Sequence, residues 1–247
     1  MKKYIAIGLS LVSTFCFSQG KPRESLDPIP TEIWDIVPKV VTPAANVGDA
    51  PSDAIVLFDG KNMNNWTNKD GAEAKWDVKD GAMYSVKGVG AIKTKQKFGD
   101  VQLHIEWRTP STVIGDGQGR GNSGIFLQGL YELQVLDNYE NPTYSNGQAG
   151  SIYKQAIPLV NVCRKPGEWQ SYDVIYVAPR FSDAGRVITP ATITVLQNGV
   201  LVENHFTIWG PTNYKGLPVY QPHSKASLEL QDHNNPVGFR NIWIREL

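Results

Sequence analysis

Hydrophobic and polar residues alternate along several short stretches of the chain. Over residues 101–108, Val, Leu, Ile and Trp occupy the odd positions, and Gln, His, Glu and Arg occupy the even ones. The same period of two recurs over residues 170–178 and 227–233. Successive side chains of a β-strand point to opposite faces, so each stretch predicts a strand with one face in a core and one polar face.

Turn signals separate these stretches. Asp80-Gly81 and Asn198-Gly199 each stand between apolar runs, as in two-residue β-hairpins. No long window shows the period of a capped helix, and 16 prolines and 23 glycines interrupt the chain throughout. The pattern predicts an all-β fold, namely a jelly-roll β-sandwich of two antiparallel sheets that leaves one outer face free to bind a ligand.

The N-terminal segment has the pattern of an export signal. Lys2 and Lys3 precede an apolar run over residues 4–12, and small or polar residues follow it. We therefore expect residues 1–19 to be a signal peptide and the protein to be exported, either periplasmic or extracellular. Attachment to the outer membrane as a lipoprotein through Cys16 is an alternative, although Phe15 stands where the lipoprotein signal has a small residue.

The rest of the chain divides by composition. Residues 20–52 contain six prolines and little periodic pattern, which predicts a linker or a strap laid across the domain. Residues 53–247 carry the strand patterns and have the length of a single β-sandwich domain. Beyond the leader, no apolar stretch approaches the ~20 residues that a membrane-spanning helix requires.

Charge and aromatic content favour a neutral partner. Lys plus Arg and Asp plus Glu both number 24, so no basic field attracts nucleic acid or an anionic membrane. Seven Trp and ten Tyr provide aromatic faces that can stack on sugar rings, although most aromatic residues fill cores. We expect a mono-, di- or oligosaccharide ligand, no nucleic-acid partner and no membrane span.

The strongest candidate site lies on two strands joined around Gly129-Leu130. Glu132 and Gln134 share one face of the second strand, Asn122 begins the first, and Asp137 follows the second. These two carboxylates and two amides are expected to converge near one rim. Carboxylates can move protons around a glycosidic bond and amides can hold sugar hydroxyls, although exposed polar residues on a half-buried strand also occur without function.

Two further groups of polar residues are candidates. His233 follows Gln231 on the same face of the third alternating stretch, at a polar strand end. Glu106 and Arg108 lie beside His104 on the polar face of residues 101–108, which forms either a ligand pocket or a solvated face. No metal-ligand spacing, phosphate-binding loop or serine nucleophile motif is found, so no metal and no cofactor is predicted.

Several motifs in order along residues 53–247 resemble one known family, the 3-keto-disaccharide hydrolase domain. The early motifs are Phe58-Asp59-Gly60-Lys61 with Trp66, Asn122-Ser123-Gly124-Ile125-Phe126, and Tyr131-Glu132-Leu133-Gln134-Val135-Leu136-Asp137. The later motifs are Gly150-Ser151-Ile152-Tyr153, Trp169-Gln170, Leu196-Gln197-Asn198-Gly199, Leu230-Gln231-Asp232-His233, and Val237-Gly238-Phe239-Arg240-Asn241-Ile242. The resemblance implies a concanavalin A-like jelly roll in an exported protein that cleaves 3-keto-glycosides by elimination and hydration.

The resemblance also implies roles for individual residues. A ketone at C3 of a sugar acidifies the hydrogen on C2, and Glu132 is the candidate base, with His233 as acid or enolate stabiliser. Lys154 and Arg240 are candidates for electrostatic stabilisation of the oxyanion. Lys154 belongs to the long irregular segment 138–168, which could form a lid or wall. The closing motif departs from the family at Asn234, where a glycine is expected, but asparagine tolerates the same left-handed backbone.

Three alternatives remain open at this stage. An ordinary glycoside hydrolase would pair Glu132 with a second carboxylate such as Asp137 or Glu106. A carbohydrate-binding module would bind sugar on the same face without cleaving it. A surface structural domain would use the sandwich for assembly alone.

Overall fold

The computed structural model describes residues 29–247 of the chain. The predicted signal peptide, residues 1–19, lies outside the described residues, as does the first part of the proline-rich stretch. The chain divides into two units, and the boundary in the sequence falls between Val40 and Val41. The described part of the first unit contains one short 3-10 helix, η1 (Ile29–Thr31), and the second unit contains every strand.

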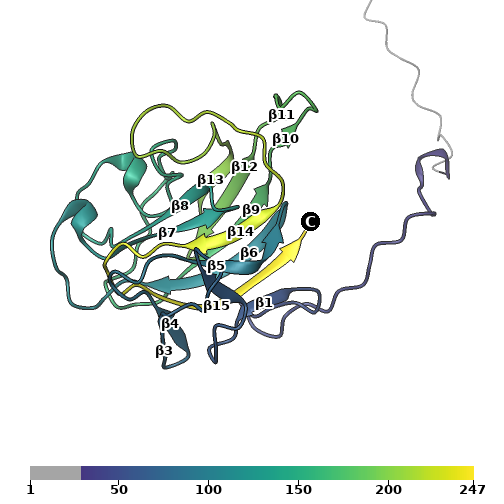
Figure 1. Cartoon of the computed structure of the whole chain (residues 1–247). Coiled ribbons are helices and arrows are strands. Elements are labelled where there is room, and N and C mark those ends of the chain that lie inside the picture. The colour runs from purple at the N-terminus through teal and green to yellow at the C-terminus, as the bar shows by residue number, and fades with distance from the viewer. Residues whose placement is uncertain (1–28) are drawn as a thin grey trace, which may run out of the picture. The chain divides into compact units, whose positions relative to one another are not determined.

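The second unit is built on two antiparallel sheets (Figure 1). The eight-stranded sheet has the order β13 (Val200–Thr207), β12 (Thr192–Gln197), β9 (Gln170–Val177), β6 (Val101–Arg108), β15 (Gly238–Glu246), β4 (Ala82–Tyr84) and β3 (Asp77–Lys79), and β1 (Ile55–Phe58) also pairs with β15. The five-stranded sheet has the order β2 (Trp66–Asn68), β5 (Ile92–Phe98), β14 (Ala226–Leu230), β7 (Asn122–Leu127) and β8 (Tyr131–Leu136).

Four short elements complete the fold. Strands β10 (Arg180–Phe181) and β11 (Val187–Thr189) form a separate hairpin, and η2 (Gly117–Gly119) and η3 (Ser145–Gly147) are single 3-10 turns. Residues 29–247 contain no α-helix. Within that range no helix is long and apolar enough to cross a bilayer. The prediction of an all-β sandwich of two antiparallel sheets is confirmed.

The alternating stretches became strands close to their predicted limits. Residues 101–108 form β6 and residues 170–177 form β9. The third stretch is shorter than predicted, because β14 ends at Leu230 and the polar residues 231–233 continue beyond the strand. Both predicted hairpin turns are present, with positive φ at Asp80 and Gly81 and at Asn198 and Gly199, as a type I′ turn requires.

The alternation decides which side chains face the core. Leu103, Ile105 and Trp107 of β6 are fully buried between the sheets, and so are Leu133 and Val135 of β8. Residues of the other parity on β6 and β8 therefore lie on the outer faces of two different sheets. These two outer faces carry separate groups of polar side chains.

Part of the proline-rich stretch packs on the outer face of the eight-stranded sheet. The Gly48 carbonyl accepts hydrogen bonds from Asn241 Nδ2 at 2.9 Å and from Trp243 Nε1 at 2.8 Å. The backbone N–H of Thr42 donates to Ser52 Oγ at 2.9 Å, which closes the segment into a loop. Residues 41–52 therefore run over β15.

Candidate functional site

A cleft of about 640 Å³ lies on the outer face of the five-stranded sheet, over β7, β8 and the residues that follow β14. Loops from three other parts of the chain complete its walls. The cleft is lined by Gln118, Asn122, Phe126, Glu132, Gln134, Tyr144, Tyr153, Thr212, Tyr214, Gln231 and His233. The structure thus brings together five of the residues predicted for the site: Asn122, Glu132, Gln134, Gln231 and His233.

Glu132 is the buried acid of this cleft. Only 6% of the residue is exposed, and burial raises the pKa of its carboxyl from 4.5 to about 8. Space for the carboxylate exists because residue 124 on the neighbouring strand β7 is glycine: a Cβ there would lie 2.5 Å from Glu132 Oε1. A carboxyl whose pKa lies near neutral pH can both accept and release a proton during a reaction.

Amide side chains surround the carboxyl of Glu132. The Gln134 amide fits its neighbours when its nitrogen points at Glu132, where it lies 3.1 Å from Oε1 and 3.3 Å from the Ser123 carbonyl. Asn122 Nδ2 donates to the Gln118 carbonyl at 2.9 Å. The cleft floor therefore offers amide donors and acceptors suited to sugar hydroxyls.

One wall of the cleft is a cluster of tyrosines from the irregular segment after β8. The hydroxyls of Tyr144 and Tyr153 lie 2.6 Å apart, and Lys154 Nζ lies 4.0 Å from the centre of the Tyr144 ring. Burial raises the pKa of the Tyr153 hydroxyl, and the neighbouring Tyr144 and the Glu132 charge raise it further. Tyr153 is therefore a neutral hydrogen-bond donor. Lys154 does not line the cleft, but its Nζ packs on the tyrosine rings of this wall.

The closing motif holds His233 at the mouth of the cleft. Asn234 has φ of 63°, so it adopts the left-handed backbone expected for it, and Asp232 Oδ1 accepts a hydrogen bond from its N–H at 2.8 Å. The Asn235 side chain accepts from the N–H of Asn122 at 3.0 Å, and Ser123 Oγ donates to the Gln231 carbonyl at 2.7 Å. These bonds tie the motif to β7.

Asp137 does not face the cleft, which corrects the prediction that it converges with Glu132. Its parity is opposite to that of Glu132 and Gln134, and it lies one residue beyond the end of β8. The carboxylate is 3% exposed and forms an ion pair with Arg120 Nη2 at 2.5 Å. It fixes the start of the irregular segment.

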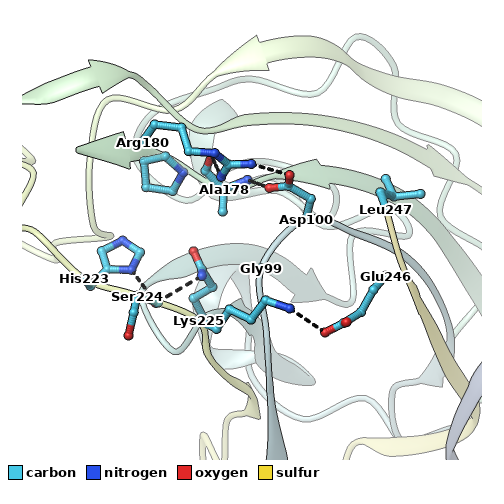
Figure 2. A pocket seen from close by; sticks show the side chains of 11 residues that line it. Gly99, Asp100, Ala178, Arg180, His223, Ser224, Lys225, Glu246 and Leu247 are labelled. Carbon is cyan, nitrogen blue, oxygen red and sulfur yellow. Dashed lines mark hydrogen bonds and ion pairs between the residues drawn. The ribbon is translucent and has the colours of Figure 1, made fainter. Parts of the chain in front are cut away.

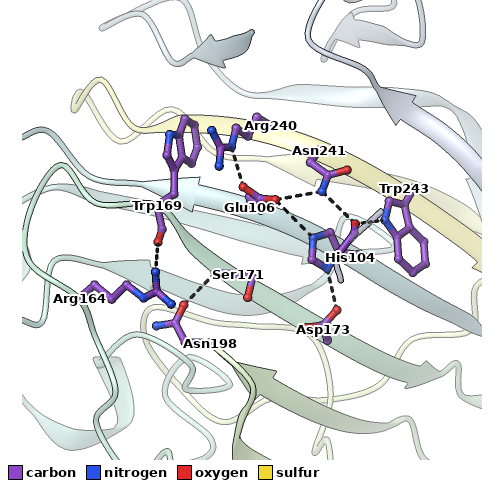
Figure 3. A network of polar contacts seen from close by, with 11 residues as sticks. His104, Glu106, Arg164, Trp169, Ser171, Asp173, Asn198, Arg240, Asn241 and Trp243 are labelled. Atoms are coloured by element: carbon purple, nitrogen blue, oxygen red, sulfur yellow. Dashed lines mark hydrogen bonds and ion pairs between the residues drawn. The ribbon is translucent and has the colours of Figure 1, made fainter. Parts of the chain in front are cut away.

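Glu106, Arg108 and Arg240 also lie outside the cleft, because β6 and β15 belong to the eight-stranded sheet and carry them on its outer face. Glu106 binds Arg240 Nε at 2.6 Å and Asn241 Nδ2 at 2.9 Å (Figure 3). Arg108 bonds to the hydroxyl of Tyr84 and stacks on Trp169. These residues form a separate polar network on the other outer face, so the structure does not bring them together with Glu132.

Sequence reasoning missed several residues of the cleft. Phe126 shares the parity of Asn122 on β7, and this alternation could have identified it. Gln118 lies in the short 3-10 turn η2, and Thr212 and Tyr214 lie in an irregular loop, so no periodic pattern signals their position. Thr212 nevertheless contacts the central residue directly, because its Oγ1 accepts a hydrogen bond from the N–H of Glu132 at 3.0 Å.

A smaller hollow at one end of the sandwich contains no predicted site residue (Figure 2). Its two cations are both neutralised within the hollow, since Arg180 pairs with Asp100 and Lys225 Nζ pairs with Glu246 at 3.0 Å. It therefore offers no free charge to a ligand. Residues 29–247 contain no group of three or more His, Cys, Asp or Glu side chains placed to hold a metal ion.

Fold and cleft together define a class of protein: a jelly-roll sandwich with a polar, tyrosine-walled cleft on the outer face of one sheet. Residues 53–245 match the family described as the 3-keto-alpha-glucoside-1,2-lyase-like domain, and the chain belongs to this family. The predicted family resemblance is confirmed.

Solved structures from Parabacteroides distasonis ATCC 8503 share the fold. One, named as a candidate glycosyl hydrolase, is 53% identical, with a TM-score of 0.86 over 90% of this chain and 97% of that chain. Two others with the same description are 21% and 22% identical, with TM-scores of 0.58 and 0.53. They cover 79% and 78% of this chain, and 94% and 99% of their own. No curated protein matches the chain.

Proposed function

We propose that the cleft cleaves the glycosidic bond of 3-keto-glycosides by elimination followed by hydration, with Glu132 as the base. Membership of the 3-keto-alpha-glucoside-1,2-lyase-like family supports this assignment. So does the 53% identical structure named as a candidate glycosyl hydrolase.

One observation carries the proposal: among the described residues that line the cleft, Glu132 is the one carboxylate. A retaining or inverting glycosidase uses two carboxyl groups on either side of the scissile bond. The two residues considered as the second acid both lie elsewhere, Asp137 paired with Arg120 and Glu106 on the other sheet. The lining therefore favours chemistry that requires a single carboxylate with His and Tyr partners.

The elimination half uses the acidity that the ketone provides. Glu132 removes the proton from C2, the electrons form an enolate with its charge on the C3 oxygen, and the C1–O bond then breaks as a C1=C2 double bond forms. His233 at the cleft mouth donates a proton to the departing oxygen. The Tyr153 hydroxyl donates a hydrogen bond to the enolate oxygen, which lowers the barrier as charge develops there.

The hydration half reverses the proton movements with water in place of the alcohol. His233 takes a proton from a water molecule as its oxygen adds to C1, and the protonated Glu132 returns a proton to C2. The sum is one keto-glycoside and one water converted to a free 3-keto-sugar and an alcohol. No oxidant and no covalent sugar–protein bond is required.

Product release from a 3-keto-glucoside and from the same glucoside without the ketone tests the proposal. The mature protein is expected to cleave the keto-sugar alone, and Glu132→Gln is expected to reduce turnover about 100-fold or more. Glutamine matches the protonated carboxyl in shape, so an unchanged melting temperature would show that the cleft is intact. Cleavage of the unoxidised glucoside would instead favour an ordinary hydrolase, and binding without cleavage of either sugar would favour a carbohydrate-binding module.

A further inference from the structure

A second hollow adjoins the cleft on the same outer face of the five-stranded sheet. Its volume is about 550 Å³, and it lies over β14 and the chain segments next to β2 and β5. Two residues, Phe126 and Gln231, line both the cleft and this hollow. The two spaces therefore meet across the β7 and β14 strands.

We propose that the cleft and this second hollow form one groove that binds a neutral saccharide chain longer than a disaccharide, with the leaving group seated in the second hollow. The inference rests on the proposed function, because the keto-sugar is placed beside Glu132. Beyond the proposed function, the inference states where the rest of the substrate binds and how long the substrate is.

The order of the strands gives the length of the groove. Glu132 stands on β8 at one edge of the sheet, and Asn68 and Lys69 stand at the end of β2 at the other edge. Four spacings of about 4.8 Å between neighbouring strands separate these edges, so the groove is about 19 Å long. β8, β7, β14 and β5 lie side by side in this layer (Figure 1). This length exceeds that of two sugar units.

The lining of the second hollow suits neutral hydroxyl groups better than an anionic ligand. Glu229 on β14 forms an ion pair with Lys69 Nζ at 3.1 Å, and its side chain is only 18% exposed. Asp232 is engaged by the N–H groups of Gly90, at 3.0 Å, and Asn234. The hollow is lined by one cation, Lys69, and by three carboxylates, those of Asp70, Glu229 and Asp232. It therefore offers hydrogen-bond acceptors to sugar hydroxyls and disfavours an anionic ligand.

The junction is placed to seat the scissile bond. Phe126 on β7 presents an aromatic ring between the two spaces, and rings of this kind pack on the C–H faces of sugars. Gln231 lies beside it, directly after β14, and its Oε1 has no hydrogen-bond partner within the described structure. That oxygen is itself buried, so it marks an unmet hydrogen bond at the junction rather than an exposed acceptor.

Three substrates with the same keto-sugar and leaving groups of increasing length test the inference: methyl 3-keto-α-glucoside, 3-keto-maltose and 3-keto-maltotetraose. We expect kcat/KM to rise at least tenfold from the methyl glycoside to the tetrasaccharide. Val89→Trp fills the second hollow from an exposed loop position, and Ile188→Trp adds the same ring to the exposed β11 as a control. Val89→Trp is expected to remove the gain for the long substrate and leave methyl glycoside turnover unchanged.

Equal kcat/KM for the three substrates, or a length preference that survives Val89→Trp, would overturn the inference while leaving the proposed function intact. A binding measurement covers the case in which no substrate is cleaved and the proposed function fails. Calorimetric titration of Glu132→Gln with unoxidised glucose, maltose and maltotetraose is then expected to show affinity that rises with length and falls in the Val89→Trp background. Affinity independent of length would overturn the groove itself.

Discussion

Gly124 on β7 and Glu132 on β8 are diagonal neighbours across the two strands, and a Cβ on residue 124 would stand 2.5 Å from Glu132 Oε1 and 2.8 Å from Phe126. The carboxyl therefore keeps its position because the neighbouring strand has no side chain there. This contact explains why the Asn122-Ser123-Gly124 motif has a glycine at position 124. The backbone there does not adopt a left-handed turn conformation that would itself require glycine. The position of the Glu132 carboxyl in the cleft therefore depends on glycine at residue 124.

Gly124→Ala is predicted to displace the Glu132 carboxyl and to reduce turnover of a 3-keto-glucoside by about 100-fold, the scale of losing the base itself. The matched control is Gly119→Ala, because a Cβ at residue 119 meets nothing within 4 Å. Initial rates and circular dichroism of both variants provide the measurement. Full activity in Gly124→Ala would show that the carboxyl position is not critical.

The sequence was sufficient to predict the fold and the floor of the cleft. Alternation fixes which side chains point away from the core, so Asn122, Glu132 and Gln134 were predicted on one surface and lie on one surface. Alternation does not say to which sheet a strand belongs. Glu106 has the same outward character as Glu132, yet it lies on the opposite outer face because β6 joins the other sheet.

The loop walls could not be predicted, because tertiary contacts place them. The loop that carries Thr212 and Tyr214 is held by Gln155, whose Oε1 accepts from the Trp209 N–H at 2.7 Å and whose Nε2 donates to the Gly210 carbonyl at 2.9 Å. Gln155 lies more than fifty residues earlier in the chain. No local period or turn motif encodes such a pairing.

The pH dependence of activity should report the ionisation of Glu132. Burial raises its pKa to about 8, and a base must be ionised in the free enzyme. When removal of the C2 proton limits the rate, we expect kcat/KM to rise about tenfold per pH unit below this pKa and to level off above it. The residual activity of Glu132→Gln should lack this rise. A profile that falls through the same region would assign Glu132 as the acid instead.

The polar network on the eight-stranded sheet should make stability depend on pH. Burial disfavours the charged form of His104, but hydrogen bonds and charges from Asp173, 2.7 Å away, and Glu106 outweigh it and raise the pKa to about 9 (Figure 3). Because the folded pKa exceeds the unfolded value of 6.5, this contribution is complete below pH 6.5 and is lost as pH rises toward 9.

Asp173→Asn isolates that contribution. The variant removes the nearest carboxylate, so the pKa of His104 falls and less stability remains to be lost between pH 6.5 and 9. Glu132 and Glu203, both with pKa values raised to about 8 by burial, also lower stability over part of this range, but equally in both proteins. Thermal melts across the range, with Asp183→Asn as an exposed control, measure the difference. Parallel curves of melting temperature against pH for all three proteins would exclude His104 as a source of the pH-dependent stability.

The hydroxyl pair of Tyr153 and Tyr144 allows the enolate contact to be separated from simple packing. Tyr153→Phe removes the donor that lies in the cleft beside Glu132, whereas Tyr144→Phe removes only its partner, 2.6 Å away. If the Tyr153 hydroxyl stabilises charge that develops on the C3 oxygen, Tyr153→Phe should lower kcat about 100-fold with little change in KM, the usual cost of one oxyanion donor. Tyr144→Phe should cost much less, because the Tyr153 donor remains and gains freedom to bind the substrate. Single-turnover rates with a 3-keto-glucoside make the comparison. Equal losses in the two variants, or a change confined to KM, would assign the pair to binding of the sugar and leave the enolate to another donor of the cleft.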